Sequence, residues 1–316
     1  GGTLSWLAAE GNDEEQTDGI AASEAIKKIN DFASRDAPFF LAVGFFRPHT
    51  PFVAPKKYFD LYDRQKIEIP EMPVDYLATL PEPAAKSIRA KKDQLNLEKE
   101  RAQEIIEAYY ATISFVDAQV GRILDQLEAN GQDKNTIIVF TSDHGYHLGE
   151  HGHWQKNTLF ENATRIPLII SIPNYENKGV KCMSPVELID LYPTLMDLTE
   201  IKTPKHVVGK SLEPLMKNVN ASVRGSALTR WRKGYSIKTK RYRLTKWGSN
   251  GELGYELYDH KNDKNELINL VNNQDYNEVM DSLKLVIEKR IVEASIKPEG
   301  LGRQFEKVKP MYKAKN

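Results

Sequence analysis

The stretch from Thr136 to Ile172, TIIVFTSDHGYHLGEHGHWQKNTLFENATRIPLIISI, decides how the rest of the chain is interpreted. Its first residues are apolar and β-branched, which predicts a buried strand over Thr136–Phe140. This strand ends on a Ser-Asp-His triplet whose last two members are Asp143 and His144. In an open α/β sheet, ligands bind beyond the carboxyl ends of the strands. Because a carboxylate and an imidazole at that edge can both bind a hard or borderline metal ion, the motif predicts a metal-dependent enzyme.

The composition is that of an ordinary soluble globular protein without a general charge bias. The 316 residues are 28% charged and 40% hydrophobic, which suits one large domain or two unequal ones. Forty-four basic residues balance forty-four acidic ones, so the net charge is zero. We therefore expect neither nucleic acid nor an anionic membrane as a partner, and any recognition of an anion has to be local.

The cysteine content and the first residues add further expectations. Cys182 is the sole cysteine, so no disulfide can form within the chain and the redox compartment stays open. No apolar run approaches the ~20 residues that a bilayer-spanning helix needs. The chain opens on Gly1-Gly2-Thr3 without an initiator methionine or a signal-like segment, so we expect it to begin inside a longer protein.

Before the metal motif, apolar spacing predicts a helix over 20–32 and then a central strand over Phe39–Phe46 that is apolar on both faces. Prolines on either side hold His49 just beyond the end of this strand. Residues 55–98 are rich in proline and charge, which predicts a long surface excursion with little regular structure. A long amphipathic helix over Lys99–Asn130 then leads to the strand of the motif.

The segments after the motif continue the same alternation. Ile166–Ile172 predicts another short buried strand, and the apolar spacing of Val186–Leu198 predicts a helix that starts close to Asp190 as its N-cap. Strands that alternate with helices predict an α/β fold with a mostly parallel sheet sandwiched by helices.

Beyond about Ser222 the sequence changes to alternating large and polar residues. Tyr235–Trp247 predicts two short antiparallel strands with one solvated face, and Tyr255–Tyr258 adds a third strand. A helix over Val279–Ala294 is expected to pack on them. We therefore divide the chain into residues 1–221 and a smaller C-terminal α+β subdomain of residues 222–316.

Several segments together carry a resemblance: PFFLAVGFFRPHTPF, TIIVFTSDHGYHLGEHGHWQK, ATRIPLIISIP, VELIDLYPTL and YSIKTKRYRLTKW with ELYDHKND. In this order they resemble the type I sulfatases of the alkaline phosphatase superfamily. The most similar branch is the iduronate-2-sulfatase-like one, which includes bacterial enzymes that desulfate polysaccharides. The resemblance implies an alkaline phosphatase-like fold in which residues 1–221 are the later portion of the catalytic domain.

The resemblance also implies calcium-dependent hydrolysis of sulfate esters by a formylglycine nucleophile, which is made from the cysteine of a Cys-x-Pro-Ser-Arg motif. That motif is absent: Cys182 lies in KCMSPV, without the arginine, and follows the metal motif instead of preceding it. We interpret Cys182 as a small packing residue. The nucleophile is expected in an N-terminal portion outside this sequence, on the same protein or as a separate chain.

Individual residues match the site of the family. Asp143 and His144 match the second pair of metal ligands, although Ser-Asp-His-Gly is also typical of a turn. His49 matches the histidine that contacts the sulfate or the bridging oxygen of the ester. Lys156 matches the lysine on the far side of the sulfate, where a compact cation suits a tetrahedral dianion.

The glycine-containing loop after the metal motif holds His147, His151 and His153. A zinc site needs three or four converging ligands, and the loop lacks helical HExxH spacing, so we favour a loop that shapes the active site. In this interpretation His151 orients or supports the site, while Tyr146 and Trp154 face the substrate or pack beneath it.

Substrate recognition is expected from aromatic and cationic side chains. Arg47 could bind a uronate carboxylate or form a surface salt bridge instead. Trp231, Arg232, Lys246 and Trp247 could roof the cleft, or could be core and surface residues. The resemblance favours a sulfated carbohydrate, such as a 2-sulfated uronate or a sulfated rhamnose of ulvan, and a periplasmic or secreted location.

Two alternatives stay open. A phosphonate monoester hydrolase or phosphodiesterase of the same superfamily would share the metal ligands. The chain could also be a non-catalytic fragment or a subunit that only completes a site.

Overall fold

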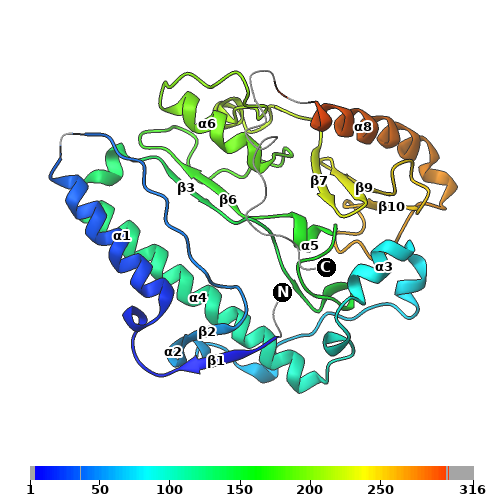
Figure 1. Cartoon of the computed structure of the whole chain (residues 1–316), viewed down its shortest axis with the longest axis horizontal. Helices are drawn as coiled ribbons and strands as arrows, with labels where there is room; N and C mark the ends of the chain where they lie inside the picture. Colours follow the sequence, from blue (N-terminus) through cyan, green and yellow to red (C-terminus); the bar gives the residue numbers. More distant parts are fainter. Residues whose placement is uncertain (1–3, 36, 297, 299–316) are drawn as a thin grey trace, which may run out of the picture. The chain divides into compact units, whose positions relative to one another are not determined.

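The computed structural model describes residues 4–35, 37–296 and 298, and the chain divides into two compact units, residues 1–178 and 179–316 (Figure 1). The domain boundary predicted between residues 221 and 222 lies inside the second unit, shortly before its antiparallel sheet, and stays a prediction. None of the helices in the described part of the chain combines the length and the apolar character that crossing a membrane requires.

The first unit mixes helices with short strands. The described helices are α1 (Thr17–Ala33), α2 (Lys56–Phe59), α3 (Glu82–Ile88), α4 (Lys99–Ala129) and α5 (Glu161–Thr164). The described strands are β1 (Trp6–Ala9), β2 (Phe52–Pro55), β3 (Ile138–Thr141), β4 (His147–Leu148), β5 (Trp154–Gln155) and β6 (Leu168–Ser171). β1 pairs parallel with β2, while β3 with β6 and β4 with β5 pair antiparallel. The predicted α/β character is present, but the described strands form separate pairs and no continuous parallel sheet.

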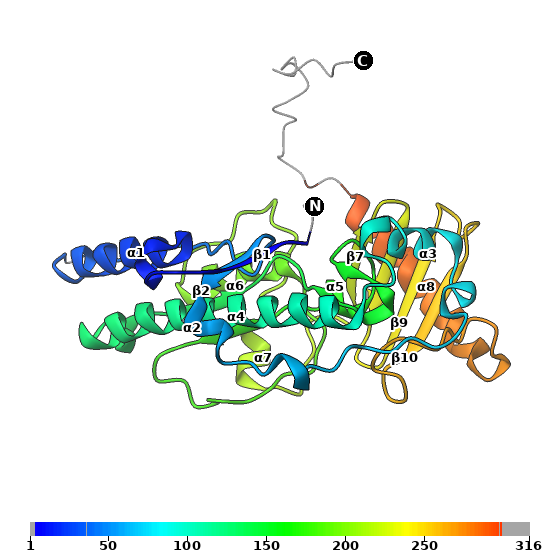
Figure 2. The same cartoon turned by 90° about the horizontal axis from the view of Figure 1, so that it is seen from below.

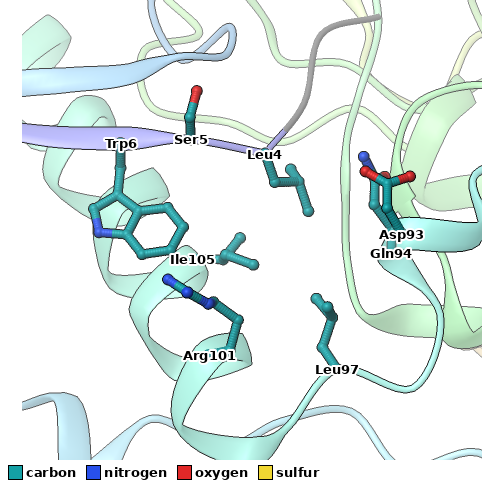
Figure 3. A pocket seen from close by; sticks show the side chains of 8 residues that line it. All are labelled: Leu4, Ser5, Trp6, Asp93, Gln94, Leu97, Arg101 and Ile105. Atoms are coloured by element: carbon teal, nitrogen blue, oxygen red, sulfur yellow. The ribbon is translucent and has the colours of Figure 1, made fainter.

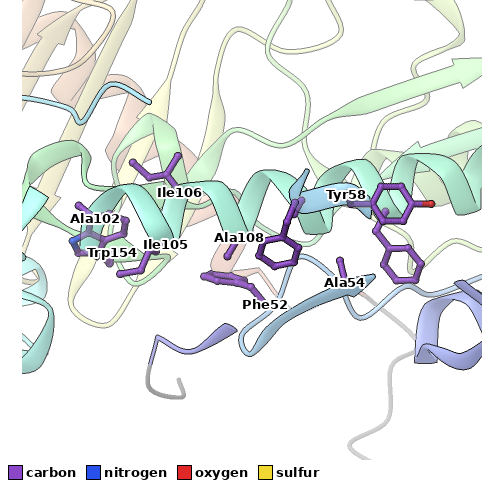
Figure 4. Close-up of a cluster of buried hydrophobic side chains, with 11 residues drawn as sticks. Phe52, Ala54, Tyr58, Ala102, Ile105, Ile106, Ala108 and Trp154 are labelled. Carbon is purple, nitrogen blue, oxygen red and sulfur yellow. The ribbon is translucent and has the colours of Figure 1, made fainter. Parts of the chain in front are cut away.

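The helix α4 organises the core of the first unit. One face of α4 is buried against β1, β2 and α2, and Figure 4 shows the resulting cluster along the helix. Its buried members are Phe52, Ala54, Tyr58, Phe59, Ala102, Ile105, Ile106, Ala108, Ala111, Phe115 and Trp154. Full burial of one large apolar side chain contributes about 1.5–3 kcal/mol to folding. The helices α1 and α4 lie where the apolar spacing predicts them, so both predictions are confirmed.

The segment Phe39–Phe46 is not a strand, although its composition predicts a central one. Phe40 is 81% exposed and Phe46 is 52% exposed. No described strand pairs with this segment. A strand requires a neighbour that accepts and donates its backbone hydrogen bonds, and apolar composition cannot supply that neighbour. The predicted central strand is therefore wrong for the described chain.

The strands β3 and β6 confirm the two strands predicted on either side of the metal motif. Val139 lies opposite Ile170 in their antiparallel register. Both strands are less buried than predicted, since Phe140 is 37% exposed and Ile169 is 59% exposed.

The excursion over residues 55–98 is more ordered than its composition suggests. It contains α2, α3 and short 3₁₀ turns at Tyr76–Thr79 and Lys92–Gln94. Tyr76 and Ile88 are buried, so these turns pack against the unit instead of running freely over its surface. The prediction of little regular structure is wrong because proline residues here begin helices: α3 has a proline in its first turn.

The second unit is built on an antiparallel sheet in the order β10-β9-β8-β7 (Figure 2). Its strands are β7 (Ala227–Trp231), β8 (Gly234–Lys238), β9 (Tyr242–Trp247) and β10 (Tyr255–Asp259), and its helices are α6 (Leu191–Leu198), α7 (Glu213–Lys217) and α8 (Asn277–Ser295). The three predicted strands and the last helix are confirmed, and β7 was not predicted. The helix predicted over Val186–Leu198 begins as a helix proper at Leu191, with Asp190 at its N-cap as expected.

Both faces of this sheet are buried, although one solvated face is predicted. On one face, α8 packs on Ile237, Leu244 and Leu257. On the other face the polar side chains pair with one another: Arg243 Nε donates to Glu266 over 2.5 Å, and Trp247 Nε1 donates to Glu256 over 2.6 Å. The strands therefore do alternate apolar and polar side chains as predicted, but the polar side chains form hydrogen bonds with other protein groups and not with solvent.

A buried ion-pair network ties α6 to the segment before the sheet. Asp190 is fully buried, and its carboxylate accepts two side-chain hydrogen bonds from Arg224, one of them from Nε over 2.9 Å. The same carboxylate accepts the backbone N–H groups of Lys210 and Glu187 over 2.8 and 2.9 Å. The side chain of this N-cap residue thus holds three other segments together and does not cap its own helix.

Candidate active site

The metal motif follows β3 directly, as the sequence predicts. Asp143 Oδ1 and His144 Nε2 lie 3.7 Å apart. His144 Nδ1 is 2.8 Å from the carbonyl oxygen of Gly145 and must donate to it, which leaves the lone pair on Nε2. The Asp143 side chain is 84% exposed and free to turn toward a ligand. A carboxylate oxygen and an imidazole nitrogen at this distance can share one cation.

This pair is only part of a metal site. Within residues 4–35, 37–296 and 298, no third carboxylate, imidazole or thiol comes close enough to complete it. The loop that carries the pair is nevertheless fixed by Gly145, whose N–H donates to the carbonyl of Ala163 over 2.9 Å. A Cβ on Gly145 would lie 2.0 Å from the carbonyl oxygen of Asn162, so a side chain there would displace the loop.

His49 is held in a defined orientation by its own loop. Its Nδ1 is 2.6 Å from the carbonyl oxygen of Thr50 and donates to it, so Nε2 is the nitrogen left to act on a ligand. The loop is fixed by Asp18 of α1, which is 2% exposed. The two carboxylate oxygens of Asp18 accept the backbone N–H groups of Phe46 and Arg47, each over 2.8 Å. Sequence reasoning missed Asp18, because an acidic residue in the first turn of a helix is common and carries no further signal.

The Arg47 side chain supports the same loop. Its Nε donates to the carbonyl of Val53 over 2.8 Å, and its guanidinium lies over the ring of Phe46 at 5.0 Å. Burial lowers the pKa of Arg47, and the Asp18 charge opposes this shift. The predicted contact with a uronate stays a prediction.

Aromatic side chains join the His49 loop to the metal motif. Phe52 at the start of β2 meets the ring of Tyr146 edge-on at 6.1 Å, and Tyr146 stacks on Tyr109 of α4 at 5.0 Å. Burial raises the pKa of the Tyr146 hydroxyl, so this group stays neutral. The His49 loop and the metal motif are therefore joined by one aromatic cluster of Phe52, Tyr146 and Tyr109, the last of which belongs to α4.

The β4–β5 hairpin places its three histidines in the interior. His147, His151 and His153 are all at most 4% exposed, and the rings of His151 and His153 lie 5.5 and 5.1 Å from that of His147. Their ring nitrogens form the following hydrogen bonds: His147 Nε2 with Thr158 Oγ1 at 2.8 Å, His151 Nδ1 with the Tyr76 hydroxyl at 2.5 Å, and His153 Nδ1 with the Ile88 carbonyl at 3.3 Å. His151 and His153 thus connect the hairpin to the excursion before α4.

This cluster predicts a stability that falls in acid. Burial, with a smaller contribution from the Lys91 charge, lowers the pKa of His153 to about 4. The unfolded chain therefore takes up this proton first as the pH falls, so the contribution of His153 is complete above its ordinary pKa of about 6.5 and is lost between about 6.5 and 4. The loss amounts to roughly 3 kcal/mol, from ~1.4 kcal/mol per pKa unit. Urea unfolding of the protein between pH 4 and 8 measures it.

His153→Gln is the matched variant, because it removes the titration and retains a polar side chain. The slope of unfolding free energy against pH should be shallower in this variant below pH 6.5. Equal slopes in the two proteins would contradict the prediction. His147, whose pKa is also lowered by burial, contributes to the slope that remains in the variant, and Glu256, whose pKa burial raises to about 7, opposes it.

Lys156 follows the hairpin immediately and has a second lysine as a neighbour. Gln155, which is buried and has a φ of +83°, accepts a hydrogen bond from Lys91 Nζ over 2.5 Å. The pKa of Lys91 is lowered, chiefly by partial burial, and repulsion from the Lys156 charge adds to the effect. Sequence reasoning missed Lys91 because it lies in the excursion that was predicted to be irregular.

Comparisons with known proteins show which family has loops of this kind. The sequence pattern of the family described as Sulfatase matches residues 6–201, a range that contains every site residue named above. The chain belongs to the sulfatase family. The resemblance inferred from the motifs is thereby confirmed. A second pattern, described as the C-terminal part of N-sulphoglucosamine sulphohydrolase, matches residues 149–293 of this sulfatase chain.

Relatives of the sulfatase chain include enzymes named for sulfated carbohydrates. A Sulfatase of Formosa agariphila is 36% identical over 289 residues, which cover 90% of the chain and 56% of the relative. Human Iduronate 2-sulfatase is 33% identical over 220 residues, and this match covers 58% of the chain and 40% of the relative. An Ulvan-active sulfatase of Formosa agariphila is 27% identical, over 83% of the chain and 49% of its own length. The chain thus spans about half the length of the curated relatives it matches.

Solved structures confirm the fold class. Phosphonate monoester hydrolase from Silicibacter pomeroyi superposes with a TM-score of 0.80 at 23% identity, over 91% of the sulfatase chain and 62% of that structure. At this identity the likeness concerns the fold alone. The predicted alkaline phosphatase-like α/β fold is confirmed.

Two residues of the loop that is predicted to shape the active site are covered in this sulfatase chain. His151 is 1% exposed and stacks on Phe160 at 3.8 Å, and Trp154 is 4% exposed within the α4 cluster. Both side chains are therefore buried in this structure, and the role of each toward substrate stays a prediction.

The four residues considered as a roof over the cleft fall into a buried pair and a more exposed pair. Trp247 is 2% exposed, and Lys246 is 1% exposed with its ammonium group 2.5 Å from Glu288. Both belong to the interior of the second unit, so their alternative role as core residues is the correct one. Trp231 is partly buried, and Arg232 is exposed with its guanidinium 5.5 Å from the Trp231 ring.

Cys182 is exposed, with its Sγ 3.5 Å from the carbonyl of Val219. The interpretation of Cys182 as a packing residue is therefore wrong. It lies in an irregular segment of the second unit that leaves its thiol at the surface.

Proposed function

We propose that the full-length protein hydrolyses sulfate esters of a sulfated carbohydrate and releases inorganic sulfate. The observation that carries this proposal is the Asp143–His144 pair, 3.7 Å apart, at the carboxyl end of β3 within the region matched by the sulfatase family. The names of the relatives support a carbohydrate substrate, because they include an iduronate and an ulvan sulfatase. A sulfated uronate or rhamnose is the proposed substrate class.

The donor set of the pair fits a divalent cation, and we assign it to calcium. Asp143 offers a hard carboxylate oxygen and His144 offers the lone pair of Nε2, since its Nδ1 donates to Gly145. A calcium ion bound there supplies positive charge against a sulfate oxygen. The remaining ligands and the formylglycine nucleophile would come from a part of the protein outside this chain.

His49 and Lys156 act on the sulfate from this chain. Because Nδ1 of His49 donates to Thr50, a protonated Nε2 can hydrogen-bond to a sulfate oxygen or protonate the departing alcohol. Lys156 lies next to Gln155, whose side chain and positive φ fix the backbone from which the lysine extends. Its ammonium group would neutralise charge on the sulfate.

Sulfate release from ulvan and from heparan sulfate by the full-length protein, followed by ion chromatography, tests the proposal. An aryl phosphonate monoester is the comparison substrate, since a phosphonate monoester hydrolase shares the fold. We expect turnover of a sulfated carbohydrate to exceed turnover of the phosphonate. Preferred cleavage of the phosphonate would mean that the site is one of a phosphonate monoester hydrolase. No turnover of either substrate would favour a non-catalytic role.

His49→Ala should lower kcat by about 100-fold or more, because proton transfer by a positioned histidine contributes about 10²–10⁴ to the rate. Lys156→Ala should also act mainly on kcat. His206→Ala, an exposed histidine of the second unit, is the control and should leave kcat unchanged. If His49→Ala or Lys156→Ala left kcat within about threefold, corresponding to less than ~0.7 kcal/mol, we would withdraw that residue's catalytic role.

We further propose a periplasmic or secreted location. A substrate that is a large polysaccharide has to be met outside the cytoplasm, and one relative, the Ulvan-active sulfatase of Formosa agariphila, is named for such a substrate. Cell fractionation with an antibody against the second unit would test this, and recovery in the cytoplasmic fraction would contradict it.

A further inference from the structure

A cavity of about 390 Å³ opens beside the N-terminal turns of α4, in the first unit (Figure 3). Its walls come from two regions that lie far apart in the sequence: the residues around the start of β1, and residues 93–105, which run from the 3₁₀ turn at Lys92–Gln94 into the first turns of α4. This volume lies at the lower end of the range typical of small-ligand sites, about 300–1,000 Å³. None of the residues assigned above to the metal or the sulfate lines it.

The lining combines apolar surface with several kinds of polar group. Trp6, Leu97 and Ile105 form the apolar part, and Asp93, Gln94 and Arg101 form the polar part. The Arg101 guanidinium lies over the Trp6 ring with its Cζ 5.0 Å from the ring centroid, so the two groups are held together at the wall. An aromatic ring beside a carboxylate, an amide and a guanidinium suits a sugar ring, which offers C–H groups for stacking and hydroxyl groups for hydrogen bonds.

The polar groups have hydrogen-bonding capacity that the protein does not use. Arg101 donates from Nη1 to Glu104 over 3.1 Å, which leaves other N–H groups of the fork available. Gln94 is 4% exposed, and its Nε2 has no hydrogen-bond partner among the described residues. Buried polar groups are normally paired, so an orphaned amide in this wall indicates a missing partner.

The cavity adjoins the loop that carries Lys156. Gln94 Oε1 accepts a hydrogen bond from Gln155 Nε2 over 3.4 Å, and Gln155 directly precedes Lys156. The apolar wall belongs to the same cluster as Trp154, against which Trp6 and Leu97 pack. One wall of the cavity is thus hydrogen-bonded to the residue that directly precedes the proposed sulfate-binding lysine.

From this arrangement we propose that the cavity is a subsite for a second sugar residue, linked to the one that carries the sulfate ester. Trp6 stacks on this sugar, and Arg101, Asp93 and Gln94 bind its hydroxyl or acidic groups. The proposal rests on the proposed sulfatase function and adds to it a preference for an oligosaccharide over a monosaccharide. Arg101 and Trp6 are specificity residues in this assignment, since neither touches the sulfate.

The test is the ratio of kcat/KM for a sulfated disaccharide to that for the matching sulfated monosaccharide, measured on the full-length protein with pairs prepared from ulvan and from heparan sulfate. Arg101→Met, which keeps the aliphatic stem, should lower this ratio about tenfold, as expected for loss of one charge-assisted hydrogen bond. Arg101→Lys should recover part of the ratio. Lys99→Met removes the same charge from an exposed position in the same turn and should leave the ratio unchanged.

A second variant and a binding measurement keep the outcomes distinct. Trp6→Leu should lower the ratio as well, and thermal unfolding will show whether the variant is folded. An unsulfated disaccharide should bind to the wild-type protein in isothermal titration and bind about tenfold more weakly to Arg101→Met.

An unchanged ratio in Arg101→Met, or equal losses for both substrates, would overturn the subsite. If no sulfate ester is hydrolysed at all, the proposed function fails, and disaccharide binding decides the subsite separately. A larger effect for an acidic neighbouring sugar than for a neutral one would assign Arg101 to a carboxylate or sulfate, and the reverse would assign it to hydroxyl groups.

Discussion

Asp143→Ala should reduce sulfate release by the full-length protein about a thousandfold or more and should lower its bound calcium. The reason is that a metal ion at this site would provide several kcal/mol of charge stabilisation to the transition state, and each ~1.4 kcal/mol corresponds to a factor of ten in rate. The carboxylate is 84% exposed, so its loss should not damage the fold. Sulfate release and the calcium content after dialysis, determined by mass spectrometry of the metal, are the two measurements.

Asp125→Ala is the control for this prediction, because it removes the same charge from an exposed position of α4. It should keep both the activity and the calcium of the wild-type protein. If Asp143→Ala retained the calcium content of the wild type, the assignment of Asp143 as a ligand would be wrong, whatever its activity. Thermal unfolding of the variant separates this outcome from a general loss of structure.

Asp190→Ala should destabilise the second unit by about 3–5 kcal/mol, the cost of leaving one member of a buried ion pair without its partner. Arg224 has 3% side-chain exposure and donates two hydrogen bonds to this carboxylate, so its charge would remain in the interior, with Glu187 as its remaining ion-pair partner in the described part of the chain. The backbone N–H groups of Lys210 and Glu187 would lose their acceptor as well. Urea unfolding followed by circular dichroism measures the change.

The double variant Asp190→Ala with Arg224→Met distinguishes the ion pair from simple loss of packing. Removing both charges should recover much of the stability, because replacing a buried pair by apolar groups often costs little. A single variant that costs less than ~1 kcal/mol, or a double variant as unstable as the single one, would show that the pair does not have the assigned role.

The local parts of the fold could be predicted from the sequence. The helices α1, α4 and α8 have apolar faces with a period that needs no knowledge of distant partners, and β3 is marked by its own β-branched residues. The strand predicted over Phe39–Phe46 is wrong because pairing depends on a neighbour elsewhere in the chain. The polar face of the C-terminal sheet was misjudged for a related reason, since Glu266, which pairs with Arg243, lies outside the strands.

In the candidate site, too, local features could be predicted from the sequence and contacts between distant segments could not. The neighbouring pair Asp143 and His144 and the orientation of His49 follow from short motifs. The roles of Asp18 and Lys91 follow from contacts between segments far apart in the chain, since Phe46 lies 28 positions after Asp18 and Gln155 lies 64 positions after Lys91, and no local pattern marks them. The supporting role expected of His151 stays a prediction, and its burial against Phe160 could be seen only in the structure.

The unpaired segment Phe39–Phe46 has a practical consequence for anyone who produces these residues alone. An apolar stretch that pairs with no described strand can act as a template for another chain, and Phe40 presents 81% of its surface to solvent. Concentrated solutions of the isolated polypeptide should therefore associate edge to edge. Replacing the exposed Phe40 by lysine should reduce this aggregation, because a charge interrupts the apolar segment through which the chains would pair.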